Sequence, residues 1–306
     1  MPSTIVSTGS NTVSADLIAV LAAVSDGVPL VLTTGQGRTL PSGPFELEHR
    51  SLQEGLRRWV EEQTHHPLGY LEQLYTFADR GRDGDGGRVI SISYLGLTRR
   101  GSAQMDGGAG WVDWYRHFPW EDHRTGEPPL VAALRQALSQ ADTAPGFLQR
   151  VATSFGAQGE GWNEELVLQR YELLYEAGLV AEARRDRGAG QAAALATGLP
   201  MEGDHRRILA TGIARLRAKI KYRPVVFELM PETFTLLQLQ RSVEALSGRL
   251  VHKQNFRRLI EQQQLVEETG DVTGDTGGRP AKLFRFRREV VAERAATGTK
   301  LPLIRS

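Results

Sequence analysis

The chain of 306 residues contains no cysteine, which excludes disulfide bonds and thiolate metal sites. It also lacks any uninterrupted apolar run of about 18 residues, the length that a membrane-spanning helix needs. Residues 1–11 are polar and have no basic start, so we expect no signal peptide. Together these absences predict a cytoplasmic protein without a membrane partner.

A strong excess of charge of one sign is also absent, because the formal net charge is only +1. The charge is nevertheless uneven: residues 223–306 carry 14 Lys and Arg against 10 Asp and Glu, and residues 1–222 carry 23 against 26. The C-terminal part is therefore mildly basic. The length allows two domains or more, and a hydrophobic content of 40% is sufficient for their cores.

Residues 40–65, LPSGPFELEHRSLQEGLRRWVEEQTH, contain the pattern around which the chain is organised. Ser51 followed by Glu54 predicts a capping box and a helix that begins at Leu52. The apolar residues of this helix recur at helical spacing, and charged residues share another face: Leu56, Trp59 and Val60, against Arg58, Glu61 and Glu62. Taken alone, the pattern fits an ordinary amphipathic helix with solvated charges equally well.

The segments on either side of this helix are typical of strands. Residues 17–33 are apolar except at Ser25-Asp26-Gly27, and the Asp-Gly pair favours a hairpin, although periodicity alone also fits a helix. After the helix, YLEQLYTF and RVISISYLGLTR are two predicted strands, joined by a glycine-rich turn. In the second of them the residues expected on one face are Ile90, Ile92 and Tyr94.

This helix and the loop before it resemble the Nudix box, whose pattern is G-x5-E-x7-R-E-U-x-E-E-x-G-U, with U a bulky aliphatic residue. Gly43 matches the first glycine, Arg57 matches the arginine, and Glu61 and Glu62 match the paired glutamates. The order of hairpin, loop, helix, strand, long turn and strand is also that of Nudix domains.

The box departs from the family pattern where chemistry is needed. His49 and Arg58 stand at glutamate positions, and Thr64 replaces the last glycine. In Nudix hydrolases the helix glutamates hold a divalent metal that polarises a pyrophosphate and activates water. Arg58 puts a fixed positive charge there and can pair with Glu61 or Glu62. We therefore interpret the box as a binding scaffold without catalytic residues or metal; an active Nudix pyrophosphohydrolase with a DNA-binding tail is the alternative.

The middle of the chain is first aromatic and then helical. The segment WVDWYRHFPWEDH can stack on an adenine or nicotinamide base, or it can pack the edge of the domain. Residues 125–200 are predicted to be a helical insertion that packs on the core or forms a dimer surface, with an Ala- and Gly-rich linker at residues 184–201. A long helix is expected at residues 206–221 and ends before Arg223-Pro224.

The C-terminal part has the pattern of a helix-turn-helix. Thr235 is predicted to cap a first helix that Gly248 ends, and a second helix is expected at residues 252–264. Its buried stripe is predicted to be Phe256, Leu259 and Ile260. The side chains predicted to contact DNA from this part are Thr235, Lys253, Gln254, Asn255, Arg257 and Arg258.

Two short strands, LVEET and LFRFR, follow and are joined by GDVTGDTGGRPAK, which predicts the wing of a winged helix. Arg279, Pro280 and Lys282 at its tip are predicted to reach phosphates or a minor groove. The partner that this module predicts is double-stranded operator DNA. A winged helix that binds protein instead is the alternative.

The C-terminal sequence FELMPETFTLLQLQRSVEALSGRLVHKQNFRRLIEQQQLVEETG closely resembles the DNA-binding end of Nudix-related transcriptional regulators. Combined with the altered box, the chain looks most similar to the NAD regulators of alphaproteobacteria, known as NadQ. This resemblance implies a cytoplasmic homodimeric repressor of NAD-biosynthesis genes. It also implies an effector nucleotide, such as NAD, ATP or ADP-ribose, and no required cofactor.

The expected fold is α+β, with a Nudix-like mixed sheet flanked by helices, a helical insertion and a C-terminal winged helix-turn-helix. The expected parts are a ligand-binding core, the insertion with its linker, a helix that returns to the core, and the winged helix: residues 1–124, 125–200, 201–222 and 223–306. The predicted nucleotide-binding residues are Gly43, Arg57, Arg58, Glu61, Glu62, Gln73, Tyr75 and Phe77, with Arg80 and Arg82 on the phosphates.

Overall fold

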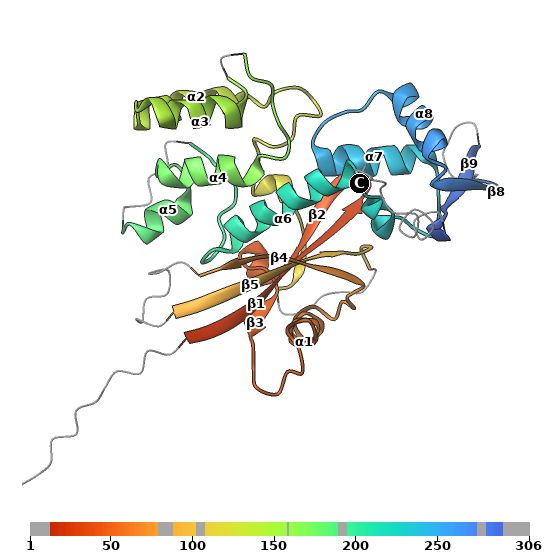
Figure 1. Ribbon diagram of the computed structural model, residues 1–306, viewed down its shortest axis with the longest axis horizontal. Coiled ribbons are helices and arrows are strands. Elements are labelled where there is room, and N and C mark those ends of the chain that lie inside the picture. The colour runs from red at the N-terminus through yellow and green to blue at the C-terminus, as the bar shows by residue number, and fades with distance from the viewer. Residues whose placement is uncertain are drawn as a thin grey trace, which may run out of the picture.

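The computed structural model describes residues 13–78, 88–101, 108–157, 159–188, 195–273 and 280–289. A sheet with helices on both faces forms the body, and a smaller module of two helices and a three-stranded sheet lies at one end of it (Figure 1). This is the predicted α+β architecture.

The hairpin at the start of the body confirms the strand interpretation of the first apolar segment. β1 (Val13–Ser25) pairs with β2 (Val28–Thr33) in antiparallel register, with Ser25 opposite Val28. The turn residues Asp26 and Gly27 both have positive φ, 51° and 74°. A type I′ turn requires this conformation, and the Asp-Gly pair adopts it readily.

The sheet of the body is mixed, as predicted. Its strand order is β4-β5-β1-β2-β6, and β3 (Ser42–Pro44) also pairs with β1. β5 (Arg88–Leu97) runs parallel to β1, whereas β4 (Tyr70–Phe77) and β6 (Gly110–Asp113) pair antiparallel with their neighbours.

The two faces of the sheet carry different helices, because successive residues of β1 point to opposite sides. Leu17, Ala19 and Leu21 pack with Leu56 and Val60 of α1 (Leu52–Thr64). The other face packs beneath α6 (His205–Ile220), and the two helices lie on opposite sides of the sheet in Figure 1.

The contact between α6 and the sheet depends on a glycine. A Cβ at Gly212 would lie 2.8 Å from a methyl carbon of Val20, closer than such atoms approach. Gly212 therefore allows α6 to lie directly on β1. A short 3-10 turn (Gly35–Gly37) follows β2 and leads toward β3.

The predicted helical insertion consists of α2 (Pro129–Ala141), α3 (Pro145–Phe155), α4 (Val167–Glu176) and α5 (Ala181–Asp186). These helices lie on the α6 side of the body (Figure 1). The expected linker at residues 184–201 is only partly correct, since Arg184 lies within α5 and both Thr197 and Met201 are buried.

The aromatic segment packs the body. Trp114, Tyr115, Phe118 and Trp120 are almost fully buried, and the first two lie in a 3-10 helix (Trp114–Arg116). Their rings have no free face for a base, so the packing alternative is confirmed for them. Trp111 is only partly buried. Its ring meets that of His66 edge to face, with the two ring centroids 5.6 Å apart.

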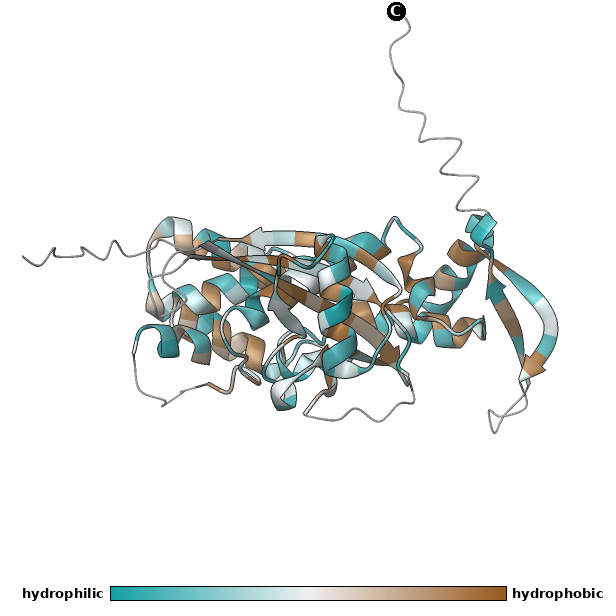
Figure 2. Ribbon diagram, turned by 90° about the horizontal axis from the view of Figure 1, so that it is seen from below, coloured by the Kyte–Doolittle hydropathy of each residue, from teal (hydrophilic) through white to brown (hydrophobic). Residues whose placement is uncertain are grey.

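The C-terminal module begins with a 3-10 helix (Val225–Leu229) and β7 (Thr233–Phe234), followed by α7 (Leu236–Ser247) and α8 (Lys253–Gln263). β8 (Val266–Thr273) and β9 (Ala281–Phe286) complete a sheet of order β7-β9-β8. Figure 2 shows this module projecting from one end of the body. Among the described residues, no helix is long and apolar enough to cross a membrane.

Candidate functional site

The helix of the altered box begins where the sequence predicts. The Ser51 hydroxyl accepts a hydrogen bond from the backbone N–H of Glu54 at 3.2 Å. The Glu54 carboxylate accepts from the backbone N–H of Arg50 at 3.1 Å, one residue before the position that a reciprocal capping box uses. The N-cap is therefore confirmed, and the return bond is displaced by one residue.

Arg58 and Glu62 form an ion pair across one turn of α1. The Arg58 Nε atom lies 3.1 Å from Glu62 Oε1, and both side chains are about half exposed. The hydrogen bond to Glu62 and the charge of that carboxylate raise the pKa of Arg58. One of the two paired glutamates is thus already engaged by a permanent cation.

His49 fills the second altered position as a packed ring. Its side chain is buried, and Nδ1 accepts a hydrogen bond from the backbone N–H of Glu46 at 3.0 Å. The ring lies against the first turn of α1, since a Cβ at Gly55 would come within 2.6 Å of His49 Nδ1. An imidazole held in this way replaces the carboxylate of the family pattern.

These residues do not fit a divalent metal. Within the part of the chain that the structure describes, no three His, Asp or Glu side chains gather closely enough to hold an ion. A hard cation needs several carboxylate oxygens together. Arg58 supplies a positive charge at that place instead.

Two further box residues contact the fold itself. A Cβ at Gly43 would lie 2.4 Å from the ring of Trp59, whose Nε1 donates to the Pro44 carbonyl at 2.8 Å. Arg57 donates to the carbonyls of Leu68 and Gly69, in the latter case at 3.0 Å. Gly43 therefore allows α1 to pack on β3, and Arg57 fixes the loop that leads into β4.

The predicted binding strand does not present all of its residues on one face. A bulge between Gln73 and Thr76 shifts the alternation of β4. Gln73 lies opposite Tyr94, which packs on the α1 face. Phe77, in contrast, is buried on the α6 side, and the Cζ atom of Arg207 of α6 lies 5.0 Å from the centroid of its ring. The structure therefore places Phe77 on the face of the sheet opposite α1, and its part in nucleotide binding stays a prediction.

Of the remaining predicted binding residues, those that the structure describes are surface groups. Glu61 is exposed on α1, and Tyr75 is exposed, with its ring centroid 4.9 Å from that of Phe77. Arg80 and Arg82 fall outside the described residues. The structure thus brings Gly43, Arg57, Arg58, Glu61 and Glu62 together on and around α1, and places Gln73 on the same side of the sheet.

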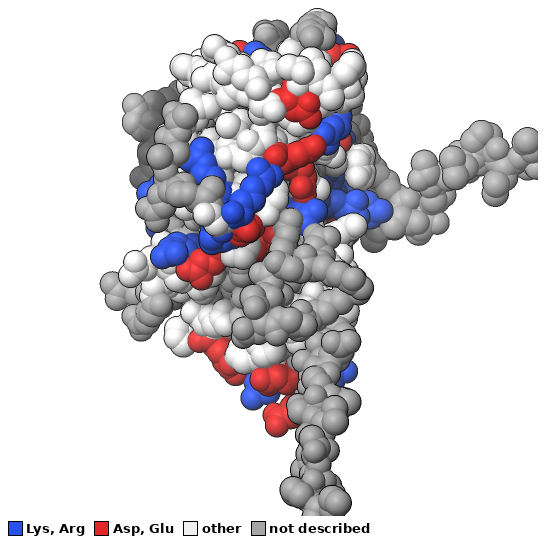
Figure 3. Space-filling model, turned by 90° about the vertical axis from the view of Figure 1, so that its left-hand side faces the viewer, with Lys and Arg blue, Asp and Glu red and all other residues white. Residues whose placement is uncertain are grey.

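The face of the molecule in Figure 3 carries basic and acidic side chains next to one another. Within the insertion, Arg150 and Glu176 pair at 2.8 Å. Such a surface has no single sign of charge with which to attract a polyanion.

The first helix of the C-terminal module begins with a complete capping box. Thr235 Oγ1 accepts from the backbone N–H of Gln238 at 3.1 Å, and Gln238 Oε1 accepts from the backbone N–H of Thr235 at 2.7 Å. The cap is confirmed, but Thr235 is buried. Its hydroxyl is used in the cap, and its contact with DNA stays a prediction.

The second helix presents a polar face to solvent. Phe256 and Ile260 are buried, whereas the predicted contact residues are all exposed: Lys253, Gln254, Asn255, Arg257 and Arg258. Leu259 was predicted to be buried, but it is 51% exposed. It lies at the border of the buried stripe and adds an apolar side chain to the outer face.

A buried glutamate that the sequence pattern did not reveal fixes the turn between these helices. Glu244 Oε1 accepts from the backbone N–H of Val251 at 3.0 Å and from Gln240 Nε2 at 2.9 Å. The only signal in the sequence was a charged residue within the apolar stripe of α7. Glu244 sets how α8 leaves α7.

Two basic side chains in the described part of the wing form ion pairs. Lys282 Nζ lies 2.9 Å from the Glu268 carboxylate, and Arg285 Nε lies 2.5 Å from that of Glu267. Both pairs join β8 to β9 on the surface. Pro280 is exposed, and Arg279 falls outside the described residues.

Sequence comparison identifies the C-terminal module. The family described as the NrtR DNA-binding winged helix domain matches residues 226–286. The ADPR responsive transcriptional repressor NtrR of Acinetobacter baylyi is 40% identical over 88 residues, which are 29% of this chain. The match spans 35% of that relative, so it covers about a third of its length.

Solved structures extend the similarity of fold to the body. NrtR of Shewanella oneidensis, in complex with a 27mer DNA, covers 91% of this chain and 95% of its own, with 21% identity and a TM-score of 0.56. A MutT/nudix family protein of Enterococcus faecalis covers 90% of this chain and 87% of its own, with 15% identity and a TM-score of 0.50. The chain therefore has the architecture of NrtR: a Nudix-fold body followed by an NrtR-type DNA-binding winged helix domain.

Proposed function

We propose that this protein is a transcriptional repressor that binds double-stranded operator DNA through α8 and the wing. The observation that carries this proposal is the outer face of α8, where Lys253, Gln254, Asn255, Arg257 and Arg258 are exposed within a module of the NrtR winged helix family. Among these side chains, arginine pairs with guanine and glutamine or asparagine pairs with adenine in a major groove.

The effector of the proposed repressor is an adenine nucleotide, with ADP-ribose first and NAD or ATP as further candidates. The Acinetobacter baylyi relative is described as responsive to ADPR. The genes that the proposed repressor controls are those of NAD biosynthesis, which the resemblance of the sequence to the NadQ regulators implies. The nucleotide binds the Nudix-fold body near α1. Arg57, Glu61 and Gln73 lie on this side of the sheet.

The body binds its nucleotide without cleaving it. Arg58 holds Glu62, and His49 occupies a glutamate position, so the metal site of a Nudix hydrolase is not assembled from these residues. The protein acts in the cytoplasm as a homodimer. A dimer presents two copies of α8 to successive half-sites, about one helical turn apart.

The decisive experiment selects binding sequences from a random duplex library. The affinity of the selected duplex is then measured by fluorescence anisotropy over a range of salt concentrations. We expect sequence-specific binding that weakens with salt and changes at least tenfold on addition of ADP-ribose, NAD or ATP. Arg257→Ala lowers the affinity, whereas Arg150→Ala, which removes an exposed ion pair on the insertion, leaves it unchanged. No enrichment of any sequence at low salt would instead favour a winged helix that binds protein.

The alternative function, hydrolysis, is tested with the same preparation. ADP-ribose, NAD and ATP are incubated with magnesium, and the products are separated by chromatography. The proposal predicts that each nucleotide is recovered intact. Sustained turnover would identify the protein as a Nudix pyrophosphohydrolase that also carries a DNA-binding domain.

A further inference from the structure

The last turn of α7 is fastened to the body by hydrogen bonds to its carbonyls. Tyr115 Oη donates to the Ala245 carbonyl at 2.7 Å, and Arg217 Nε donates to that of Leu246 at 2.9 Å. The backbone N–H of His123 donates to the Gly248 carbonyl at 2.8 Å. The last four carbonyls of a helix lack partners within it, so the body satisfies acceptors that α7 cannot satisfy itself.

The Arg217 side chain belongs to a buried group of charges. Glu121 lies between Arg170 of α4, at 2.6 and 2.9 Å, and Arg217 of α6, at 2.5 Å. All three side chains are at most 1% exposed. One carboxylate therefore faces two guanidiniums, and the negative end of α7 supplies part of the balancing charge.

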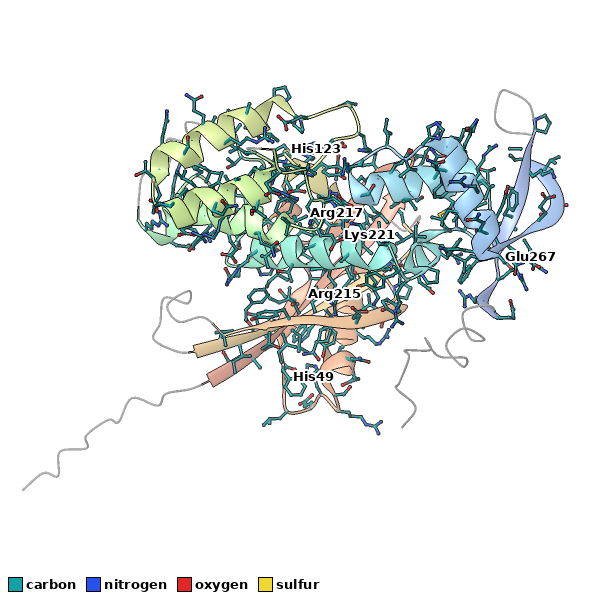
Figure 4. The ribbon with its side chains drawn as sticks, turned by 45° about the horizontal axis from the view of Figure 1, so that its top comes forward. His49, His123, Arg215, Arg217, Lys221 and Glu267 are labelled. Carbon is teal, nitrogen blue, oxygen red and sulfur yellow. The ribbon has the colours of Figure 1, made fainter. Side chains whose placement is uncertain are left out.

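Figure 4 shows where this group lies. Arg217 points from α6 toward the space between the insertion and α7, whereas Arg215, on the same helix, points toward β4. Arg215 pairs with Glu72 of β4 at 3.2 Å and is 53% exposed. The two arginines thus have different surroundings although only one residue separates them.

Gly248 allows the module to approach the body this closely. It has a φ of 71°, and a Cβ there would lie 2.4 Å from the Glu121 carbonyl oxygen. The same Cβ would lie 2.9 Å from both Arg217 Nη2 and Tyr115 Oη. No other residue fits at this junction without displacing the module.

The insertion holds the junction from its outer side. Lys221, at the end of α6, pairs with Glu164 at 2.7 Å and with Glu165 at 2.6 Å. Arg249, in the turn between α7 and α8, reaches Glu164 at 3.4 Å. The insertion therefore contacts α6 and the winged helix together.

We propose that Arg217 and Gly248 are positioning residues that lock the winged helix onto the body, so that α8 keeps one orientation within each protomer. A swing of the winged helix would take the Leu246 carbonyl away from Arg217 Nε, and a buried donor left without its acceptor costs far more than the loss of a solvated contact. The nucleotide signal consequently reaches the DNA as a movement of one whole protomer relative to the other. This inference rests on the proposed function for its signal, but the lock itself is a property of the single chain.

The absence of cysteine makes a direct test possible. Gln53→Cys on α1 and Gln262→Cys on α8, both at exposed positions, receive spin labels, and labelled chains are diluted into an excess of unlabelled chains. The distance between the labels is then measured by pulsed electron paramagnetic resonance. We expect one narrow distance distribution that is the same in the free protein, with ADP-ribose and with the selected DNA. A shift or broadening on addition of either ligand would overturn the lock.

Variants test which residues are responsible. Arg217→Met is expected to broaden the distribution and to weaken DNA binding at least tenfold, whereas the matched control Arg215→Met changes neither. Tyr115→Phe removes a single hydrogen bond to α7 and is expected to broaden the distribution less, which provides a second measurement if Arg217→Met does not fold. A narrow, unchanged distribution in a folded Arg217→Met protein would overturn the assignment. Failure of the unaltered protein to bind any DNA would contradict the proposed function, yet the distance measurement would still decide the lock.

Discussion

The Arg58 guanidinium lies 3.1 Å from the Glu62 carboxylate, within the helix that would carry metal ligands in a Nudix hydrolase. The pair is exposed, so its contribution to stability is small. The pair matters for metal binding, because the permanently charged Arg58 guanidinium occupies the place where a divalent metal ion would have to bind. Opposite charges at this spacing attract each other, and like charges repel.

The first prediction reverses that charge. Arg58→Glu adds a carboxylate beside Glu61 and Glu62, and we expect it to bind Mn²⁺ measurably more tightly than the unaltered protein does. Calorimetric titration with Mn²⁺ measures the change. Arg58→Gln is the control, because it removes the cation without adding a ligand and is expected to gain far less. Equal affinity in all three proteins would show that the box lacks a metal site for reasons other than Arg58.

A second prediction separates the roles of the exposed residues of α8. Arg257→Ala should cost about 1–3 kcal/mol of binding free energy and relax the preference for one base pair. Lys253→Ala should weaken binding to all sequences similarly and reduce the slope of log affinity against log salt by about 1. Anisotropy titrations against the selected duplex and its single-base variants measure both effects. If the two variants lose affinity in the same pattern, Arg257 contacts the backbone and not a base.

The third prediction concerns the close contact between Gly43 and Trp59. Gly43→Ala forces a methyl group into the indole ring, and overpacking of this kind costs about 1–3 kcal/mol of unfolding free energy. Gly69→Ala is the matched control, since a Cβ there would meet nothing within 4 Å. Urea unfolding monitored by tryptophan fluorescence compares the two. A stable Gly43→Ala protein would mean that α1 can shift on β3.

The fourth prediction follows from a buried histidine. Burial lowers the pKa of His117 from 6.5 to about 4, and its Nδ1 lies 3.0 Å from the Leu199 carbonyl. The neutral ring donates there, and its buried Nε2 has no partner among the described residues. The folded chain therefore binds this proton less readily than the unfolded chain does. The contribution of the neutral His117 ring to the free energy of unfolding is complete above pH 6.5 and is lost as the pH falls toward 4.

The size of this effect is about 1.4 kcal/mol of unfolding free energy per pH unit for one such group. Urea unfolding at successive pH values should show this slope for His117, with a further contribution in the same direction from His205. His117→Gln should be less stable at neutral pH but less sensitive to acid. His252→Gln, at an exposed position, should keep the slope of the unaltered protein, and an unchanged slope in His117→Gln would contradict the prediction.

Features that depend on neighbouring residues were predictable from the sequence. The Asp26-Gly27 turn, the Ser51 cap and the Thr235 cap each require only a short stretch of chain, and all three are present. The helix-turn-helix followed from the same kind of pattern. The burial of Leu259 was predicted wrongly because it lies at the border of the apolar stripe, where spacing alone does not decide.

Features that depend on distant parts of the chain were not predictable. The bulge that turns Phe77 toward α6 leaves no mark in the sequence of β4. Glu121 meets Arg170 and Arg217, which lie 49 and 96 positions further along the chain. From the sequence alone, each of these three residues would be taken for an ordinary charged residue on the surface. Only the tertiary fold brings them together.

The ion pairs of the wing affect how salt acts on the proposed DNA complex. Lys282 and Arg285 must leave Glu268 and Glu267 before they can reach a phosphate. Added salt weakens these internal pairs as well as the contact with DNA, so the two effects partly cancel. The wing should therefore contribute less to the salt dependence of binding than its number of cations suggests, and the protein should dissociate from its operator faster than a wing with unpaired cations would allow.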